Sequence, residues 1–345
     1  MHTLFLTRRF YPQIGGVEKH VFELSKRLIA KGHKITIITE NASHEKSVET
    51  YKDIKIYRLN VGKEDWFKKF RIWKSMWQLR KLIEQSEIVH CHDVFFWYLP
   101  FRFLMPRKKV FTTFHGYESY PIAKKAIVIR KLSEKLSSGN ICVGDFIPKW
   151  YGTRPTYISY GAVNLSKENK EGRENINSAV FIGRLDEQTG ILEYTKATEI
   201  IKKQIPDFKL TVIGDGKYKN KIGNNIKVLG FQKNPEKYFQ KYHFAFVSRY
   251  LSIIEAMAAK RLVFALYDNQ VKEDYLKMAP FAKWIIIEKD PQKLAQKAVY
   301  YLHHPQEEKK LIESAYQWTK KQSWEALTDI YLSLWKNMPP QNKTD

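Results

Sequence analysis

Two adjacent glycines, Gly15 and Gly16, lie between a short apolar stretch and a run with helical spacing, in FYPQIGGVEKHVFELSKRLIAKGHKITIIT. Glycine adopts positive φ at no steric cost, so the pair would suit a tight turn. The missing side chains would also let a ligand reach backbone N–H groups at a helix N-terminus, where the helix dipole favours anions. The pair by itself leaves both interpretations open, a turn and a phosphate-binding loop.

The second half of the chain repeats this design, because apolar strand-like runs end directly in glycine or in a charged residue. FIGRLDEQTGI places Arg184 after such a run and predicts a helix from about Gly190. VIGDG ends in Gly214 and Gly216, and SIIEAMAAK places Glu255 in the first turns of a short predicted helix. Each motif is weak alone, since glycine after a strand is common in α/β proteins. Their order and spacing together are much more specific.

These motifs need a scaffold, and the apolar pattern predicts one in which strands alternate with helices. Such alternation indicates βαβ units and parallel sheets. The predicted strands are 2–7, 34–39, 54–60, 88–93, 110–116, 178–185, 208–216, 226–231, 244–248 and 261–266. The clearest predicted helices are 17–33, 127–138, 191–205, 235–243, 252–260, 291–305 and 323–338.

The same rhythm runs through the first half of the chain and restarts near residue 155, which predicts two α/β domains in tandem. A length of 345 residues is typical of two domains. We place the first domain at residues 1–160 and the second at 161–322, with a polar, disordered tail at 339–345. Ligands bind outside the carboxyl ends of parallel strands, so two such domains would enclose a cleft between them.

Composition narrows the class of protein. The two cysteines, Cys91 and Cys142, lie far apart without metal-ligand spacing, which argues against a disulfide framework and a zinc site. No run of about 18 apolar residues is present, so no segment is expected to span a bilayer. The N-terminal MHTLFLTRRFYP also lacks the long apolar core of a signal peptide. We expect a cytoplasmic protein.

The chain carries 59 Lys and Arg against 36 Asp and Glu, a net charge of +23. A field of this size attracts nucleic acid, an anionic membrane or phosphorylated substrates. A lysine-rich codon bias would give the same charge with no function attached. No helix-turn-helix, RNA-recognition or zinc-finger pattern accompanies it, so we expect no nucleic-acid partner.

Taken in order, the motifs FYPQIGGVEKHV, GHKITIIT, FHGYE, FIGRLDEQTG, VIGDG, VLGFQ and IIEAMAAK resemble the glycosyltransferases of family 4, also called group 1. The resemblance covers nearly the whole chain. It implies the GT-B fold, in which two Rossmann-like, doubly wound α/β domains face each other across a cleft. It also implies that the last helix, 323–338, crosses back onto the first domain.

The resemblance implies a nucleotide diphosphate sugar, with UDP or GDP, as donor substrate rather than any cofactor. The second domain would hold most of the donor, and its diphosphate would lie against Gly15 and Gly16, which favours the phosphate-loop interpretation of that pair. His115, in FHGYE, matches a histidine at the cleft floor close to the transferred sugar. Arg184 matches an arginine that meets the donor phosphates, as a bidentate guanidinium can. Glu255 matches a carboxylate that accepts hydrogen bonds from the ribose hydroxyls.

We therefore expect His115 and Glu255 in the catalytic site. The expected donor-binding set is Gly15, Gly16, Arg184, Thr189, Gly214, Gly216 and Glu255, and no metal ligand is expected. Without the motifs, His115 would be an ordinary loop histidine, Arg184 a surface arginine, and Glu255 a helix glutamate that interacts with the dipole.

Two departures from the family pattern bear on activity. Thr189 stands where the family usually has a phosphate-neutralising lysine, and Val247 where it usually has a first glutamate. The segment SRYLSIIEAMA is also shorter than usual by about four residues, which leaves Ser248 and Arg249 in that space. Either the chain positions the donor sugar differently, or it is a non-catalytic GT-B homologue that binds a nucleotide or a partner.

One segment outside these motifs, KEDWFKKFRIWKSMWQLRKLI at 63–83, has the pattern of a surface-binding helix. Trp66, Phe70, Trp73 and Trp77 fall on one face of a predicted helix, and seven Lys or Arg accompany two acids. Aromatic and basic amphipathic helices are typical of interfacial membrane binding. The alternative is that the aromatics pack on the sheet and the bases are solvated. The first interpretation implies a lipid-linked acceptor.

The function expected from the sequence is metal-independent, retaining transfer of a hexosyl unit to a glycan or lipid-linked acceptor. Such a reaction would belong to cell-envelope polysaccharide or glycolipid synthesis. The enzyme would then be cytoplasmic or peripheral on the inner face of the membrane.

Overall fold

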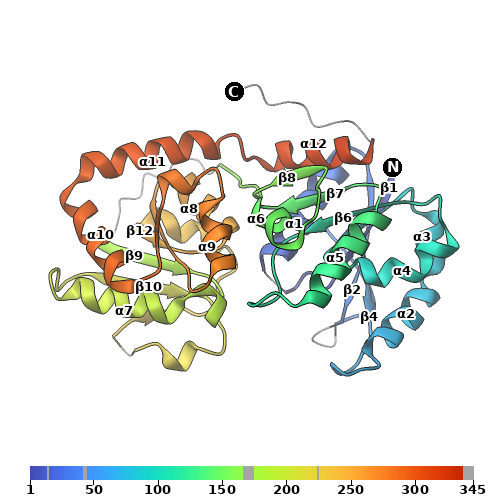
Figure 1. Cartoon of the computed structure of the whole chain (residues 1–345), viewed down its shortest axis with the longest axis horizontal. Coiled ribbons are helices and arrows are strands. Elements are labelled where there is room, and N and C mark those ends of the chain that lie inside the picture. The colour runs from blue at the N-terminus through green and yellow to red at the C-terminus, as the bar shows by residue number, and fades with distance from the viewer. Residues whose placement is uncertain (14, 42–44, 166–174, 224, 337–345) are drawn as a thin grey trace. The chain divides into compact units, whose positions relative to one another are not determined.

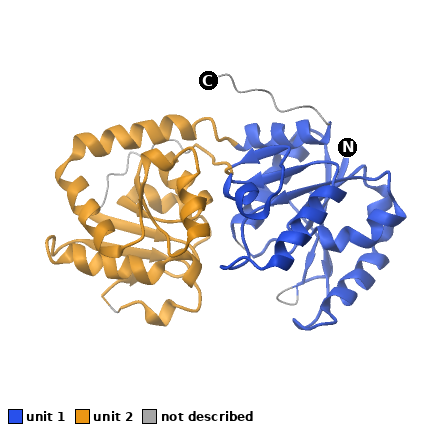
Figure 2. Cartoon of the chain, in the orientation of Figure 1, with its two compact units in different colours: residues 1–159, 324–345 blue, residues 160–323 orange. Residues whose placement is uncertain are grey.

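The computed structural model describes residues 1–13, 15–41, 45–165, 175–223 and 225–336 (Figure 1). The chain forms two compact units (Figure 2). Unit 1 comprises Met1–Ser159 together with the C-terminal segment that begins at Trp324, and unit 2 comprises Tyr160–Ser323. The predicted tail at 339–345 lies outside the described residues.

Unit 1 contains an eight-stranded sheet in the order β3-β4-β2-β1-β5-β6-β7-β8. All neighbouring strands are parallel except β3 and β4. The strands are β1 His2–Thr7, β2 Lys34–Glu40, β3 Val48–Tyr51, β4 Ile54–Leu59, β5 Ile88–His92, β6 Lys109–Phe114, β7 Asn140–Val143 and β8 Tyr157–Ser159. The helices are α1 Gly16–Ala30, α2 Lys68–Gln78, α3 Arg80–Gln85, α4 Phe95–Leu104, α5 Lys124–Leu136, α6 Phe146–Tyr151 and α12 Trp324–Trp335.

Unit 2 contains a six-stranded parallel sheet in the order β11-β10-β9-β12-β13-β14. The strands are β9 Asn175–Ile182, β10 Lys209–Ile213, β11 Lys227–Val228, β12 Tyr242–Phe246, β13 Leu262–Leu266 and β14 Ile286–Glu288. The α-helices are α7 Ile191–Lys202, α8 Tyr250–Ala258, α9 Gln270–Lys277, α10 Pro291–His303 and α11 Pro305–Thr319. Four 3₁₀ turns complete the unit, η1 Glu187–Thr189, η2 Lys219–Lys221, η3 Pro235–Lys241 and η4 Ala282–Trp284.

The central strands are continuous apolar runs, which is why they could be predicted from the sequence. Leu4, Phe5 and Leu6 of β1 are all fully buried, as expected for a parallel strand covered by helices on both faces. The patterns single out neither the short strands β7, β8 and β14 nor α4, whose apolar run contains Pro100. The helix predicted at 235–243 is present over Pro235–Lys241, but it is a 3₁₀ helix rather than an α-helix.

Each sheet has one point where the winding direction reverses. In unit 1 the sequence order of the strands reverses between β1 and β5, and in unit 2 between β9 and β12. The connections on the two sides of such a point leave the sheet in opposite directions, which opens a crevice at the carboxyl ends of the strands. In open α/β sheets ligands bind at such points, so the two reversal points are the candidate ligand positions of the two units.

Helix α12 is attached to unit 1 through a buried chain of hydrogen bonds. Trp335 Nε1, which can only donate, lies 3.0 Å from His90 Nδ1. His90 Nε2 therefore carries a proton and donates to Thr113 Oγ1 at 2.8 Å. Thr113 then donates to the Tyr331 hydroxyl at 2.8 Å, and Tyr331 donates to His20 Nε2 at 2.8 Å. The direction of every bond follows from the tryptophan, and it leaves the proton of His20 on Nδ1.

Replacement of Tyr331 by Phe removes the hydroxyl that joins Thr113 and His20. Both partners are buried, so we expect the variant to lose about 1–3 kcal/mol of unfolding free energy. Calorimetry should show a lower melting temperature for unit 1. The matched control is Tyr300→Phe in unit 2, whose hydroxyl bonds Glu307 at an exposed site; its effect should stay within about 0.5 kcal/mol. Equal effects of the two substitutions would contradict the buried chain.

The same network predicts that acid destabilises unit 1. Burial lowers the pKa values of His20, His90 and His92 well below 6.5. Below about pH 6.5 these histidines therefore bind protons in the unfolded chain but stay neutral in the folded chain. These three histidines and His115, whose pKa burial lowers to about 3, together should lower the unfolding free energy by about 5 kcal/mol per pH unit below that point. Asp93, whose pKa burial raises to about 6, offsets part of this loss below pH 6.

Denaturation of unit 1 between pH 8 and pH 5 checks this, with His90→Gln as the matched variant. Glutamine keeps one donor and one acceptor but does not titrate, so the slope should fall by about 1.4 kcal/mol per pH unit, the contribution of one group. A stability of unit 1 that is flat or rises towards pH 5 would exclude the proposed cause.

Candidate functional site

The glycine pair of unit 1 opens α1 at the carboxyl end of β1. Gly15 is the N-cap residue with an extended backbone at φ −158°, and it has no side chain with which to cap the helix. Neither glycine has positive φ, so the tight-turn interpretation is wrong. A Cβ on Gly16 would meet no atom within 4 Å. A Cβ on Gly15, in contrast, would lie 2.3 Å from Glu18 Oε2, so this carboxylate lies over the helix N-terminus. Contact of the glycine pair with a diphosphate stays a prediction.

His115 follows β6 at the same edge of the sheet and contacts residues from β5 and α1. Its Nε2 lies 2.9 Å from His92 Nδ1, and its backbone N–H donates to Asp93 Oδ1 at 3.0 Å. The ring of His20 lies edge-on to the ring of His115, with 4.8 Å between centroids. Residues from three separate elements therefore meet around the predicted catalytic histidine.

The proton positions of this histidine pair follow from burial. His92 Nε2 is buried and has no hydrogen-bond partner in the described part of the chain. A buried N–H donor without a partner costs about 1–3 kcal/mol, so the proton of His92 belongs on Nδ1, where it donates to His115. His115 therefore carries its own proton on Nδ1. Burial and the Arg130 guanidinium lower the pKa of His115 to about 3, so its ring is neutral at pH 7.

Arg130 of α5 also holds the loop that carries His115. Its guanidinium donates to the carbonyl of Gly116 and, at 2.9 Å, to Glu118. It stacks on Tyr151, 3.9 Å from the ring centroid. The sequence analysis missed His20, His92, Asp93 and Arg130. Of these, only His92 and Asp93 could have been inferred, because the motif IVHCHD places them at the end of the strand next to the one that precedes His115.

In unit 2 the predicted glycine loop is shaped by contact between two backbones. Gly214, at φ +143°, would place a Cβ 1.8 Å from the carbonyl oxygen of Gly183. Gly216, at φ +154°, would place one within 3 Å of the Leu185 backbone. The N–H of Leu185 donates to the Asp215 carbonyl at 2.9 Å. Close packing against the Gly183–Leu185 loop thus explains both glycines, and their contact with a donor stays a prediction.

Arg184 and Thr189 lie on this loop but have opposite surroundings. The Arg184 side chain is 61% exposed, and its Nε lies 3.4 Å from Asp186. Thr189 is buried, and its hydroxyl lies 2.7 Å from the Arg184 carbonyl and 2.8 Å from the Asp186 carbonyl. Arg184 is accessible from solvent, and its contact with a donor stays a prediction. Thr189 closes the loop, which speaks against a side-chain contact with a donor.

Glu255 lies deeper than expected. It is the sixth residue of the nine-residue helix α8 and is only 7% exposed, whereas a carboxylate that meets a ribose would need to be open to the ligand. It lines a small pocket whose other residues are Val163, Asn164, Glu236, Lys237, Gln240, Ala258 and Ala259. The lining does not include Arg184, and the ribose contact of Glu255 stays a prediction.

The shortened segment before α8 brings another arginine to the reversal point. Val247 is buried, and the helix begins two residues after Ser248. Arg249 is the N-cap residue of α8, and its Nη2 donates to Gln188 Oε1 at 2.6 Å. Arg184 Nη2 approaches the same oxygen at 3.4 Å. The sequence analysis noted Arg249 only as a residue that fills space.

The aromatic segment at 63–83 forms two helices, α2 and α3, rather than one. Trp66 precedes α2, so the prediction of four aromatics on one helical face is wrong for this residue. Trp66, Phe70 and Trp77 are 82%, 57% and 50% exposed, which excludes packing of these three on the sheet. Trp73 is half-buried, and its Nε1 donates to the Phe96 carbonyl at 2.8 Å.

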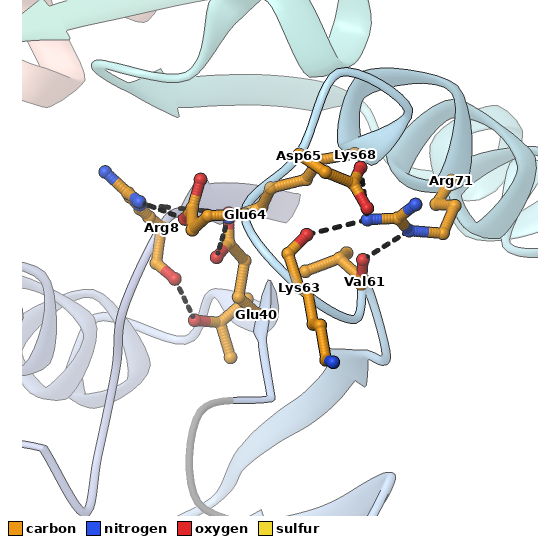
Figure 3. A network of polar contacts seen from close by, with 9 residues as sticks. Arg8, Glu40, Val61, Lys63, Glu64, Asp65, Lys68 and Arg71 are labelled. Atoms are coloured by element: carbon orange, nitrogen blue, oxygen red, sulfur yellow. Dashed lines mark hydrogen bonds and ion pairs between the residues drawn. The ribbon is translucent and has the colours of Figure 1, made fainter.

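The exposed aromatics are presented by an ordered scaffold, which Figure 3 shows. Arg71 donates to the carbonyls of Val61 and Lys63, each at 2.7 Å, and to Asp65 at 2.9 Å. Lys68 joins Glu64 at 2.5 Å and Glu40 at 2.8 Å. These bonds fix the loop that precedes α2.

Two kinds of feature are absent from the described residues. These residues contain no group of three or more His, Cys, Asp or Glu side chains placed to hold a metal ion. They also contain no helix with the length and apolar character needed to cross a membrane.

Comparison with known proteins identifies relatives over both units. The family model named Glycosyltransferase Family 4 matches residues 14–150, and the model named Glycosyl transferases group 1 matches residues 164–318. An uncharacterized glycosyltransferase of Methanocaldococcus jannaschii, MJ1178, is 26% identical over 92% of this chain and 93% of its own length.

A second relative is the gpi3 subunit of phosphatidylinositol N-acetylglucosaminyltransferase from Schizosaccharomyces pombe. It is 27% identical over 60% of this chain, and the match spans 49% of its own length. Among solved structures, Anabaena HepE in complex with UDP-glucose has a TM-score of 0.74 at 12% identity. That match covers 98% of this chain and all of HepE.

The structural similarity shows the GT-B fold, as do the two parallel-sheet α/β units. The two family models, matched in order over both units, identify the chemistry class. The chain belongs to the glycosyltransferases of family 4, group 1.

Proposed function

We propose that the protein transfers a hexosyl unit, with retained configuration, from a UDP- or GDP-sugar to a glycan or lipid-linked acceptor in cell-envelope polysaccharide or glycolipid synthesis. The observation that carries this proposal is the exposed Arg184 at the reversal point of unit 2, on a loop shaped by Gly214 and Gly216. A guanidinium there can bind phosphate oxygens with two hydrogen bonds. The donor is a substrate, and the proposal includes neither a cofactor nor a metal.

This reaction requires electrostatic stabilisation of the leaving group, because negative charge develops on the departing nucleoside diphosphate. Arg184 supplies a permanent cation, and the N-terminus of α1, which begins at the glycine pair, supplies the positive end of a helix dipole. His115 is neutral at pH 7 and carries its proton on Nδ1, so it suits hydrogen bonding to a sugar hydroxyl rather than neutralisation of phosphate.

A second candidate function is donor or partner binding without catalysis. Two observations favour it: Val247 occupies the place of a family glutamate, and Glu255 is buried in the second turn of α8. Incubation with a panel of nucleotide sugars, with and without acceptors, distinguishes the two functions. Release of free nucleoside diphosphate supports catalysis, and binding without any release supports the alternative.

We also propose that α2 and the loop before it bind an anionic membrane surface, which would bring a lipid-linked acceptor to the enzyme. Trp66 and Phe67 are 82% and 64% exposed on the ordered loop of Figure 3, and Phe70 continues the patch. Basic residues of the same segment would attract anionic headgroups while the aromatics enter the interface. The name of the fission-yeast relative includes a lipid, phosphatidylinositol, which is compatible with this choice.

Substitution of Arg184 by Ala tests the donor site. We expect affinity for UDP or GDP to fall by about 1.5–3 kcal/mol, the range for a hydrogen bond to a charged group. Calorimetric titration measures the change. The melting temperature should hardly move, since the side chain is largely exposed. Unchanged affinity in the variant would remove Arg184 from the donor site.

The triple variant Trp66→Ser, Phe67→Ser, Phe70→Ser tests the membrane surface. Full burial of each side chain would contribute about 1.5–3 kcal/mol, so even partial insertion predicts at least a tenfold loss of partition onto phosphatidylglycerol vesicles. Phe231→Ser in unit 2, a residue 58% exposed, is the matched control and should sediment like the parent. Equal sedimentation of all three proteins would rule out this surface.

A further inference from the structure

We propose that Arg249 is a second phosphate-binding residue, which forms with Arg184 a two-guanidinium clamp for the donor diphosphate at the β9/β12 reversal point. The identity of the ligand rests on the proposed function. The clamp itself is argued from the contacts of these two side chains.

The two guanidiniums converge on one neutral oxygen. Gln188 Oε1 accepts from Arg249 Nη2 at 2.6 Å and lies 3.4 Å from Arg184 Nη2. Two positive groups held this close repel each other, and the Gln188 oxygen together with the Asp186 carboxylate, 3.4 Å from Arg184 Nε, offsets part of that repulsion. A diphosphate, which carries several anionic oxygens, would match both planar groups and remove the repulsion.

Both arginines lie just after the carboxyl ends of β9 and β12, at the reversal point of unit 2. Arg184 follows the last residue of β9 by two positions, and Arg249 follows the last residue of β12 by three. The two strands are parallel neighbours, and the winding of the sheet reverses between them. Ligands of open α/β sheets bind at such a point, so the two side chains flank the predicted ligand position from opposite sides.

The backbone around Arg249 is firmly held, which fixes where its side chain begins. Ser248 Oγ donates to the Thr189 carbonyl at 3.1 Å and thereby ties the two loops together. The buried Lys272 donates to the Ser248 carbonyl. The N–H of Tyr250 donates to the Tyr275 hydroxyl at 2.6 Å.

The clamp would supply the second positive charge that a lysine at position 189 usually provides in the family. Thr189 is only 4% exposed and bonds two backbone carbonyls, so this position cannot present a cation to a ligand. The shortened segment before α8 instead places Arg249 opposite Arg184. The second charge comes from the neighbouring strand rather than from the same loop.

Arg249→Gln tests the clamp, with Lys196→Gln as a matched loss of one charge from the same unit. Lys196 is exposed on α7 and pairs with Glu193. Titration of UDP, GDP and inorganic pyrophosphate should give a dissociation constant about 10- to 100-fold higher for Arg249→Gln, as for loss of a hydrogen bond to a charged group. The Lys196→Gln protein should bind like the parent.

Gln188→Glu gives a readout that a purely structural role would not produce. A carboxylate at this position would sit between the two guanidiniums and take the place of a bound anion. We expect the melting temperature to stay the same or rise, while affinity for the diphosphate probes falls at least tenfold. Gln188→Met, which removes the oxygen without adding charge, should lower affinity less.

The outcomes separate the clamp from the proposed function. Nucleoside diphosphate binding that is lost in Arg184→Ala but unchanged in Arg249→Gln and Gln188→Glu overturns the clamp and leaves the function standing. Pyrophosphate binding that needs Arg249, without binding of any nucleotide, supports the anion clamp and overturns the proposed donor. Absence of binding by the parent protein to all three probes overturns both.

Discussion

The reversal of winding at one point in each parallel sheet is the constraint on which the candidate sites depend. It brings the carboxyl ends of β1 and β5, and of β9 and β12, to the edges of crevices. Residues far apart in sequence, such as Arg184 and Arg249, thereby come to share a single partner. No individual motif could supply this arrangement, because it follows from strand order and not from local sequence.

The same residue type serves two different purposes at these edges. Gly214 and Gly216 are required because two backbones of unit 2 pack so closely that any Cβ would collide. Gly16 opens onto free space, so nothing in the described chain needs a glycine there. A glycine motif read from sequence therefore indicates close approach without saying whether the approaching group is protein or ligand.

Much of the fold could be predicted because central parallel strands are buried on both faces and form continuous apolar runs. Short edge strands such as β8 and β14 carry too few residues for that signal. The depth of Glu255 was missed because the sequence predicts a short helix there but not which of its residues are covered by the rest of the unit. Burial of Thr189 was missed because the sequence does not reveal whether a threonine hydroxyl bonds a ligand or the backbone of its own loop.

The two units differ in the kind of polar group that they offer, and this difference has a structural cause. In unit 1, Trp335 can only donate, so it sets the direction of a hydrogen-bond chain that ends at His20, and burial keeps that ring neutral. In unit 2 the exposed group is a guanidinium, which stays charged at any accessible pH. Neutral donors suit sugar hydroxyls and permanent cations suit phosphates. Under the proposed function, unit 1 would position the sugar through uncharged hydrogen bonds, while Arg184 and Arg249 would carry most of the charge compensation for the leaving diphosphate.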